Sequence, residues 1–353
     1  MKITFPHMGT LSIPIKTLLI EMNVDVMLPP PTSQKTIALG AKYAPESICL
    51  PFKANLGNIM ESIALGADAF IMLGGNGPCR FGFYGHLIKQ ITDEHGFKCQ
   101  FIDLSDSNVN KYKFFKNLNP DLTLKKFFNA LRISWFKLIT IEKIEERLFY
   151  SRPRTSTEGF MKLEKAHEHF LKTIDNAFTI KEIQAAALEF QQKASFLEVY
   201  KGESGEKVHV IRLVGDIFIM LDHSCNYNII RELGKLGVQV SPSINVSTWL
   251  KSNIFSYRLT PYGRSVKKSA LCYLKNSVGG HGLDTIGNSV NYAKKAAGII
   301  HLMPLTCTPE IVARSILPSI STKFDIPVMY LTLDEHSSAT NMYTRLEAFV
   351  DML

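Results

Sequence analysis

Cysteine is scarce in this chain, with 6 residues in 353, and long uncharged apolar runs are missing. So few cysteines exclude a small secreted fold held together by disulfides. No uncharged apolar stretch approaches the roughly 20 residues that a membrane-spanning helix requires. The opening residues MKITFPHMGT break at Pro6, too soon for the apolar core of a signal peptide. We therefore expect a cytoplasmic protein whose reduced cysteines are free, catalytic or metal-bound.

The charge balance is basic. There are 40 Lys and Arg residues against 32 Asp and Glu, which gives a formal net charge of +8. Such a balance suits an anionic cofactor, an acidic partner protein or nucleic acid. Part of the excess lies in residues 111–150, where no recognised nucleic-acid motif accompanies it. We expect that segment to present a solvated helix face, and we expect no nucleic-acid partner.

Apolar and amphipathic segments alternate in the first and last parts of the chain, which predicts strands alternating with helices. Strands are expected at residues 2–6, 24–28, 69–73, 98–104, 208–214, 238–240, 298–303 and 326–333. The middle has few β-branched runs and several amphipathic stretches, interrupted at Arg152-Pro153-Arg154. The predicted fold class is α/β, with two doubly wound, mostly parallel-sheet domains of the Rossmann or flavodoxin type over 1–105 and 207–353. Residues 106–206 are expected to form a helical insert.

Two cysteines occupy equivalent places in the two α/β parts. Cys79 ends the segment ADAFIMLGGNGPC and Cys307 ends AGIIHLMPLTC, so each follows a predicted strand and precedes a predicted helix. Ligands bind at this edge of open α/β sheets, and a helix N-terminus lowers the pKa of a thiol. With Cys49 they form a candidate three-cysteine metal site. The alternative on spacing alone is three buried packing residues, because the close CxxC spacing of readable metal sites is missing.

The remaining motifs are weaker candidates. Cys99 is expected in a strand and Cys272 in a helix, both as packing residues, and Cys225 on a loop where a reactive thiol could sit. The glycine-rich turns at 74–79 and 279–282 match neither a P-loop nor a dinucleotide fingerprint. The segment 334–336, Asp-Glu-His, ends the last predicted strand near Cys307. It could be an acid–base cluster, but we expect Glu335 to lie in a solvated loop that caps the final helix.

Long blocks of sequence carry a family resemblance. They are FPHMGT (5–10), ICLPFKANLGN (48–58), GADAFIMLGGNGPCRFGFYG (66–85), VGDIFIMLDHSCNYNIIRELGKLGVQV (214–240), GGHGLDTIGNSVNYAKKAAGIIHLMPLTCTPEIVARSILPS (279–319) and DEHSSATNMYTRLEAFVDML (334–353). In this order they closely resemble the CoA-substrate-specific enzyme activase-like proteins of the 2-hydroxyacyl-CoA dehydratase superfamily. The middle, about 106–206, is similar only in being helical.

The resemblance implies an iron–sulfur protein. In related dehydratase and reductase subunits, three cysteines from two α/β domains hold a [4Fe–4S] cluster whose fourth iron position can stay open. The matching residues are Cys49 in CLPFK, Cys79 in GPCRFG and Cys307 in CTPE. Thiolates are the preferred ligands of such clusters, and an open iron could act as a Lewis acid. Arg80 could offset the cluster charge or meet an anionic substrate, and a surface salt bridge is the alternative.

The resemblance also implies a partner. In the superfamily, an ATP-hydrolysing activator of the actin and sugar-kinase fold passes low-potential electrons to the cluster-bearing protein. This chain resembles the acceptor part alone, so dehydratase- or reductase-type chemistry on an acyl-CoA or other small anionic substrate is expected, and a dimer by analogy. One alternative is a non-catalytic electron relay that binds the activator. Another is a ligand-binding α/β protein that holds structural zinc or no metal.

Overall fold

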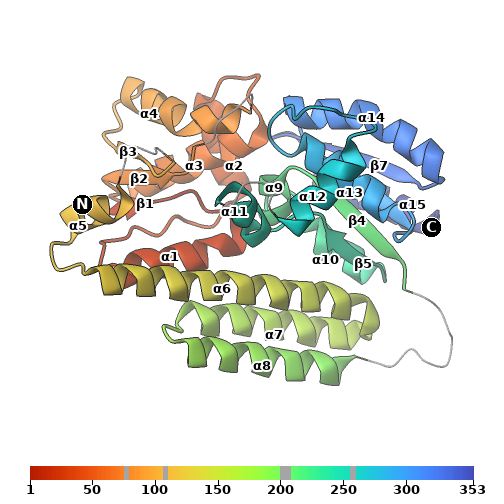
Figure 1. The fold of residues 1–353 in the computed structure, drawn as a ribbon, viewed down its shortest axis with the longest axis horizontal. Coiled ribbons are helices and arrows are strands. Elements are labelled where there is room, and N and C mark those ends of the chain that lie inside the picture. The colour runs from red at the N-terminus through yellow and green to blue at the C-terminus, as the bar shows by residue number, and fades with distance from the viewer. Residues whose placement is uncertain (75–78, 106–109, 199–207, 255–259) are drawn as a thin grey trace.

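The strands form two separate parallel sheets (Figure 1). The computed structural model describes residues 1–74, 79–105, 110–198, 208–254 and 260–353. The first sheet has the order β1-β2-β3, with β1 Ile3–Thr4, β2 Ala69–Met72 and β3 Gln100–Asp103. The second has the order β5-β4-β6-β7, with β4 Val210–Gly215, β5 Gln239–Pro242, β6 Gly298–Pro304 and β7 Val328–Leu333. The predicted α/β fold with two parallel sheets is therefore confirmed.

Helices cover both faces of the first sheet. On one face, α3 (Leu50–Ala64) and α4 (Tyr84–Glu94) pack their apolar side chains against β2. On the other face lie α1 (Ser12–Glu21), α5 (Lys111–Leu118) and the start of α6. The β2 residues are all buried, as expected of a strand covered on both sides. A further helix, α2 (Gln34–Tyr43), packs on α3.

The strand predicted over residues 24–28 was wrong. Only Val26 pairs there, as an isolated parallel bridge to Ile3. The three prolines at 29–31 follow directly, and because proline has no N–H to donate, the ladder cannot continue through them.

The second sheet is also covered on both faces. Side chains alternate along β7, so that Met329 and Leu331 face α10 (Ile229–Lys235) and α15 (Ala339–Asp351), while Val328 and Tyr330 face the opposite core. That opposite core is built by α12 (Pro261–Ala270), α13 (Gly282–Tyr292) and α14 (Thr308–Phe324). Two shorter helices, α9 (Ile217–Leu221) and α11 (Val246–Ile254), follow β4 and β5.

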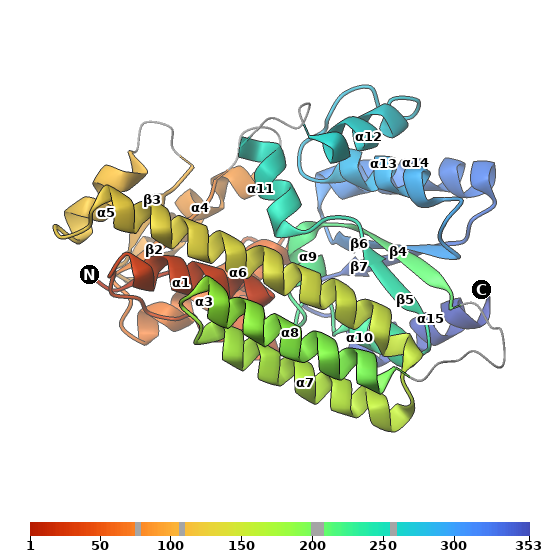
Figure 2. The ribbon, with the colours of Figure 1, turned by 60° about the horizontal axis from the view of Figure 1, so that its bottom comes forward.

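The middle of the chain is helical, as the sequence predicts. It contains α5, α6 (Leu124–Ser151), α7 (Thr157–Asp175) and α8 (Ile180–Leu197). The short helix η3 (Arg152–Arg154) separates α6 from α7 at the expected interruption. The long helix α6 runs past both sheets, contacting α1 on one side and β5, α10 and α11 on the other (Figures 1 and 2). The three-domain division at 105 and 206 stays a prediction, because α6 shares cores with its neighbours.

None of the helices in the described residues is long and apolar enough to cross a membrane.

Candidate functional site

Each of the three predicted cysteine ligands stands at the N-terminus of a helix. Cys49 precedes α3, Cys307 precedes α14, and Cys79 precedes the short helix η2 (Arg80–Phe83), which leads into α4. At all three positions the side chain makes no capping hydrogen bond. Proline lies in the first turn of both α3 and α14, where its missing N–H leaves no bond unmade. The thiols are therefore not used to cap the helices that they precede.

Hydrogen bonds from Arg80 join the three cysteine-bearing segments. Its Nη1 donates to the carbonyl oxygen of Ser47 at 2.9 Å, two residues before Cys49. Its Nη2 donates to the carbonyl oxygen of Thr306 and, at 3.1 Å, to the Thr306 hydroxyl, directly before Cys307. Arg80 itself follows Cys79. One exposed guanidinium thus brings together three loops that are far apart in the sequence, and its partners are oxygens of these loops rather than the carboxylate of a surface salt bridge.

Thr306 has an unusual backbone. Its φ of +66° is in the left-handed region, which a β-branched residue rarely adopts. Such a conformation costs roughly 1–3 kcal/mol and persists only where neighbouring contacts enforce it. The two hydrogen bonds from Arg80 are contacts of this kind, so the Cys307 loop is held in a shape that it would not adopt alone.

Burial controls the acidity of the three thiols. Cys49 and Cys307 are buried, with 7% and 8% of their surface exposed, and Cys79 is half-buried. Burial raises the pKa of all three thiols, and the nearby Asp216 carboxylate raises each pKa further. The Cys49 sulfur also shares a hydrogen bond of 2.6 Å with the Tyr84 hydroxyl. The predicted lowering of the thiol pKa was wrong, because desolvation outweighs the effect of the helix N-termini.

A glycine permits close packing beside Cys79. Gly280 has a φ of +47°, and a Cβ at this position would lie 2.9 Å from Pro309 Cγ and 3.7 Å from the Cys79 sulfur. At Gly282 a Cβ would lie 2.5 Å from the Pro309 carbonyl oxygen. The segment 279–282 therefore lets the start of α13 approach the start of α14 and Cys79 closely. In the other predicted glycine turn, residues 75–78 lie outside the described part of the chain.

A buried polar cluster behind Cys307 was missed by the sequence analysis. Glu310, in the first turn of α14, is 1% exposed and its Oε2 lies 2.8 Å from His301 Nε2 on β6. The Thr285 hydroxyl donates to the same Oε2 at 2.9 Å. Glu310 Oε1 and His301 Nδ1 have no hydrogen-bond partner in the described structure. One feature of the sequence could have indicated this cluster: His301 lies inside the otherwise apolar strand GIIHLMP, close to Cys307.

Two further sequence predictions were wrong. Glu335 does not cap the final helix: it forms an ion pair with the buried Lys53 of α3, and Ser338 caps α15 instead. Cys272 is exposed in a turn after α12 rather than buried in a helix. Cys99 is buried directly before β3, close to its predicted place. Cys225 is 1% exposed and burial raises its pKa well above the ordinary value, which argues against a reactive thiol.

The three cysteines differ from the ligand set of a single metal ion. Among the described residues, no three Cys, His, Asp or Glu side chains are grouped so that they could hold one metal ion. A cluster differs from a single ion because each thiolate binds its own iron atom. Three thiols suit iron–sulfur chemistry, and the helix N-termini would stabilise the negative charge of a cluster. By donor type and helix placement, Cys49, Cys79 and Cys307 fit such a group.

A comparison with protein families complements this geometry. The model of the CoA enzyme activase uncharacterised domain (DUF2229) matches residues 7–246. No curated protein matches the sequence. The matched range contains Cys49 and Cys79 and ends before Cys307. It also contains the helical middle, which the blocks of sequence resemblance did not include. Because the match spans well over half of the chain, this protein belongs to the family of the CoA enzyme activase uncharacterised domain.

Proposed function

We propose that this protein holds a [4Fe–4S] cluster on Cys49, Cys79 and Cys307 and accepts low-potential electrons from a separate ATP-hydrolysing activator. The observation that carries the proposal is the set of Arg80 hydrogen bonds, which gather three distant cysteine segments. Thiolates are the ligands that such clusters prefer. The chain belongs to the family of the CoA enzyme activase uncharacterised domain, and the activase in that description supports an activator protein as its partner.

The chain's own residues would hold and shield the group. A bound cluster supplies one-electron transfer and, at an iron without a protein ligand, Lewis acidity. The N-termini of α3 and α14, which Cys49 and Cys307 precede, favour negative charge. Arg80 adds a fixed positive charge beside the ligands, and the Tyr84 hydroxyl offers a hydrogen bond to the Cys49 sulfur. Hydrogen bonds to ligand sulfurs are among the factors that set a cluster's reduction potential.

The first test is anaerobic purification with iron and acid-labile sulfide analysis, and visible spectra before and after dithionite. We expect about four iron and four sulfide per chain and a broad absorption that bleaches on reduction. Cys79→Ser should lose most of the iron, whereas Cys99→Ser, a buried cysteine outside the site, should keep it. Equal iron contents in these two variants would contradict the ligand assignment. A wild-type chain that takes up no iron on reconstitution would contradict the cluster.

A second test separates an enzyme from an electron relay. The reconstituted protein is incubated with an activator, ATP, a reductant and candidate acyl-CoA thioesters. Product in excess of the protein indicates dehydratase- or reductase-type catalysis. Reduction of the cluster without product indicates the relay.

A further inference from the structure

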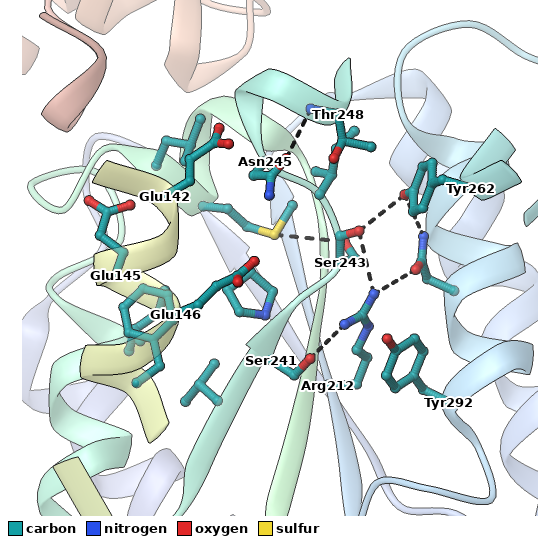
Figure 3. A pocket seen from close by; sticks show the side chains of 18 of the residues that line it. Glu142, Glu145, Glu146, Arg212, Ser241, Ser243, Asn245, Thr248, Tyr262 and Tyr292 are labelled. Atoms are coloured by element: carbon teal, nitrogen blue, oxygen red, sulfur yellow. Dashed lines mark hydrogen bonds between the residues drawn. The ribbon is translucent and has the colours of Figure 1, made fainter. Parts of the chain in front are cut away.

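A cavity of about 560 Å³ lies between α6 and the second sheet. Its volume is in the range of small-molecule sites, roughly 300–1,000 Å³. None of the three candidate ligand cysteines lines it. Figure 3 shows two unlike walls: glutamates from α6 on one side, and Arg212 with hydroxyl and amide side chains on the other.

Arg212 is a buried cation without a carboxylate partner. It projects from β4, is 4% exposed, and its guanidinium lies 3.6 Å from the Tyr292 ring centroid. Its Nη1 donates to the Ser241 hydroxyl at 2.6 Å and its Nη2 to Asn288 Oδ1 at 2.7 Å, whereas its Nε has no partner. Within the described residues it forms no ion pair at 4.0 Å or less. A buried charge that lacks a counter-ion is costly, so this wall favours an anion.

Neighbouring side chains fix the guanidinium in place. The Tyr262 hydroxyl donates to the Ser243 carbonyl oxygen at 3.0 Å and accepts from Asn288 Nδ2 at 2.9 Å. Asn288 in turn holds Arg212 Nη2. A network of this kind gives a cation a defined position, which is what oriented recognition of a planar anion requires.

The opposite wall is acidic. Glu142, Glu145 and Glu146 lie on one stretch of α6, and none forms an ion pair at 4.0 Å or less with a described residue. Glu142 accepts the Ser247 N–H at 2.8 Å, and Glu145 accepts the Thr10 hydroxyl at 2.8 Å. Burial, together with the neighbouring Glu142, raises the pKa of Glu145 to about 7 despite the hydrogen bond from Thr10. These like charges would repel an anion and attract a cation.

We propose that this cavity binds a small zwitterion, with its carboxylate on Arg212 and its ammonium group on the α6 glutamates. An anion alone would leave the glutamates unpaired, and a cation alone would leave the guanidinium unpaired. Apolar side chains of Phe149, Ile230 and Val240 line the cavity as well, and they suit a methylene chain joining the two charged ends. The site uses none of the cysteines, so it is independent of the proposed cluster.

The test is isothermal titration calorimetry on the full chain at about pH 8, where most of Glu145 is ionised. The probes are unbranched ω-amino acids from glycine to 6-aminohexanoic acid, each with the alkyl carboxylate and the alkylammonium ion of the same length. We expect one length to bind at least about tenfold more tightly than both of its singly charged controls, as expected for one added charge-assisted hydrogen bond.

Variants assign the two ends. Glu145→Gln keeps the side-chain shape and should reduce the affinity of the best ω-amino acid to about that of its alkyl carboxylate. Glu158→Gln, on the exposed face of α7, is the matched control and should leave binding unchanged. Arg212→Lys keeps the charge but loses the planar fork, and should weaken binding about tenfold or more. If alkyl carboxylates bind as tightly as the ω-amino acids, or if no probe binds wild type, the proposal is wrong, and neither result would affect the proposed cluster.

Discussion

Three buried cations in this protein differ in what partners their charge. Lys53, Lys137 and Arg212 are each 4% exposed or less. Lys53 is paired with a carboxylate, and Arg212 faces the cavity. Lys137 instead donates to the Thr17 hydroxyl at 2.7 Å and to the Asp175 carbonyl oxygen at 3.1 Å. Neutral acceptors replace only part of the lost hydration, so the charged form of Lys137 is disfavoured.

Lys137 should make stability depend on pH. Burial lowers its pKa to about 8 from an ordinary 10.5, so the unfolded chain binds more protons between these values. Stability should therefore rise with pH across this window, by up to about 3 kcal/mol. Urea unfolding between about pH 7.5 and 10.5 should show this slope in the difference between wild type and Lys137→Met. The exposed Lys126→Met on the same helix should show none, and a flat difference for Lys137→Met would contradict the argument.

At the scale of elements, the crossing of α2 and α3 depends on two glycines. A Cβ at Gly40 would lie 1.7 Å from the Lys53 carbonyl oxygen, and one at Gly57 would lie 2.0 Å from the Thr36 carbonyl oxygen. The two helix backbones are therefore in direct contact. Because Cys49 directly precedes α3, this crossing also sets where that cysteine lies.

Gly57→Ala should destabilise the fold although alanine is the better helix former. Helix propensity alone favours alanine by about 1 kcal/mol. The added methyl group must push α2 and α3 apart, and we expect a net loss of about 2 kcal/mol from chemical denaturation. Ala64→Gly, at the exposed end of α3, is the control for propensity and should cost no more than about 1 kcal/mol. A Gly57→Ala variant as stable as wild type would show that the crossing can relax.

Most elements could be predicted from the sequence because their signals are local. The apolar periods of β2, β6 and β7 and the break at Arg152-Pro153-Arg154 were read correctly. Helices α1 and α2 were not predicted from the sequence. The apolar and polar residues of α1 are weakly segregated around its axis, and α2 contains Gly40, which is a poor helix former. Cys272 was misplaced because α12 ends at Ala270.

At the scale of the whole molecule, specific contacts join the two sheet regions, beside an apolar core in which Ile37, Leu50 and Ala54 pack with residues of the second region. Lys53 of α3 pairs with Glu335, which follows β7, and Arg80 reaches Thr306. A Cβ at Gly9, where φ is +54°, would lie 2.3 Å from the Leu221 carbonyl oxygen of α9. The Arg80 contact joins the residues next to Cys79 and Cys307, and Lys53 lies in the first turn of α3, which Cys49 precedes. Lys53 and Arg80 therefore contribute both to the relative position of the sheets and to the geometry of the site.

Removing one partner of the Lys53–Glu335 pair should be more harmful than removing both. Glu335→Gln leaves a buried, unpaired ammonium group, so we expect a loss of about 3 kcal/mol in the free energy of unfolding. Adding Lys53→Met should recover most of that loss. The exposed pair Lys89–Asp93 is the control, and Asp93→Asn should cost less than about 0.5 kcal/mol. If Glu335→Gln costs no more than Asp93→Asn, the pair does not join the two regions.

The sequence alone determined the α/β alternation, the helical middle and the placement of Cys79 and Cys307 before helices, because these depend on residues close together in the chain. Only the tertiary structure decided that Arg80 joins the loops of Ser47 and Thr306, and that Glu335 pairs with Lys53. The tertiary structure also raises the pKa of the thiols, where the sequence had predicted a lower one, and it places the buried Arg212 beside a cavity. Burial and long-range pairing set these properties, and both depend on which distant segments the folded chain brings into contact.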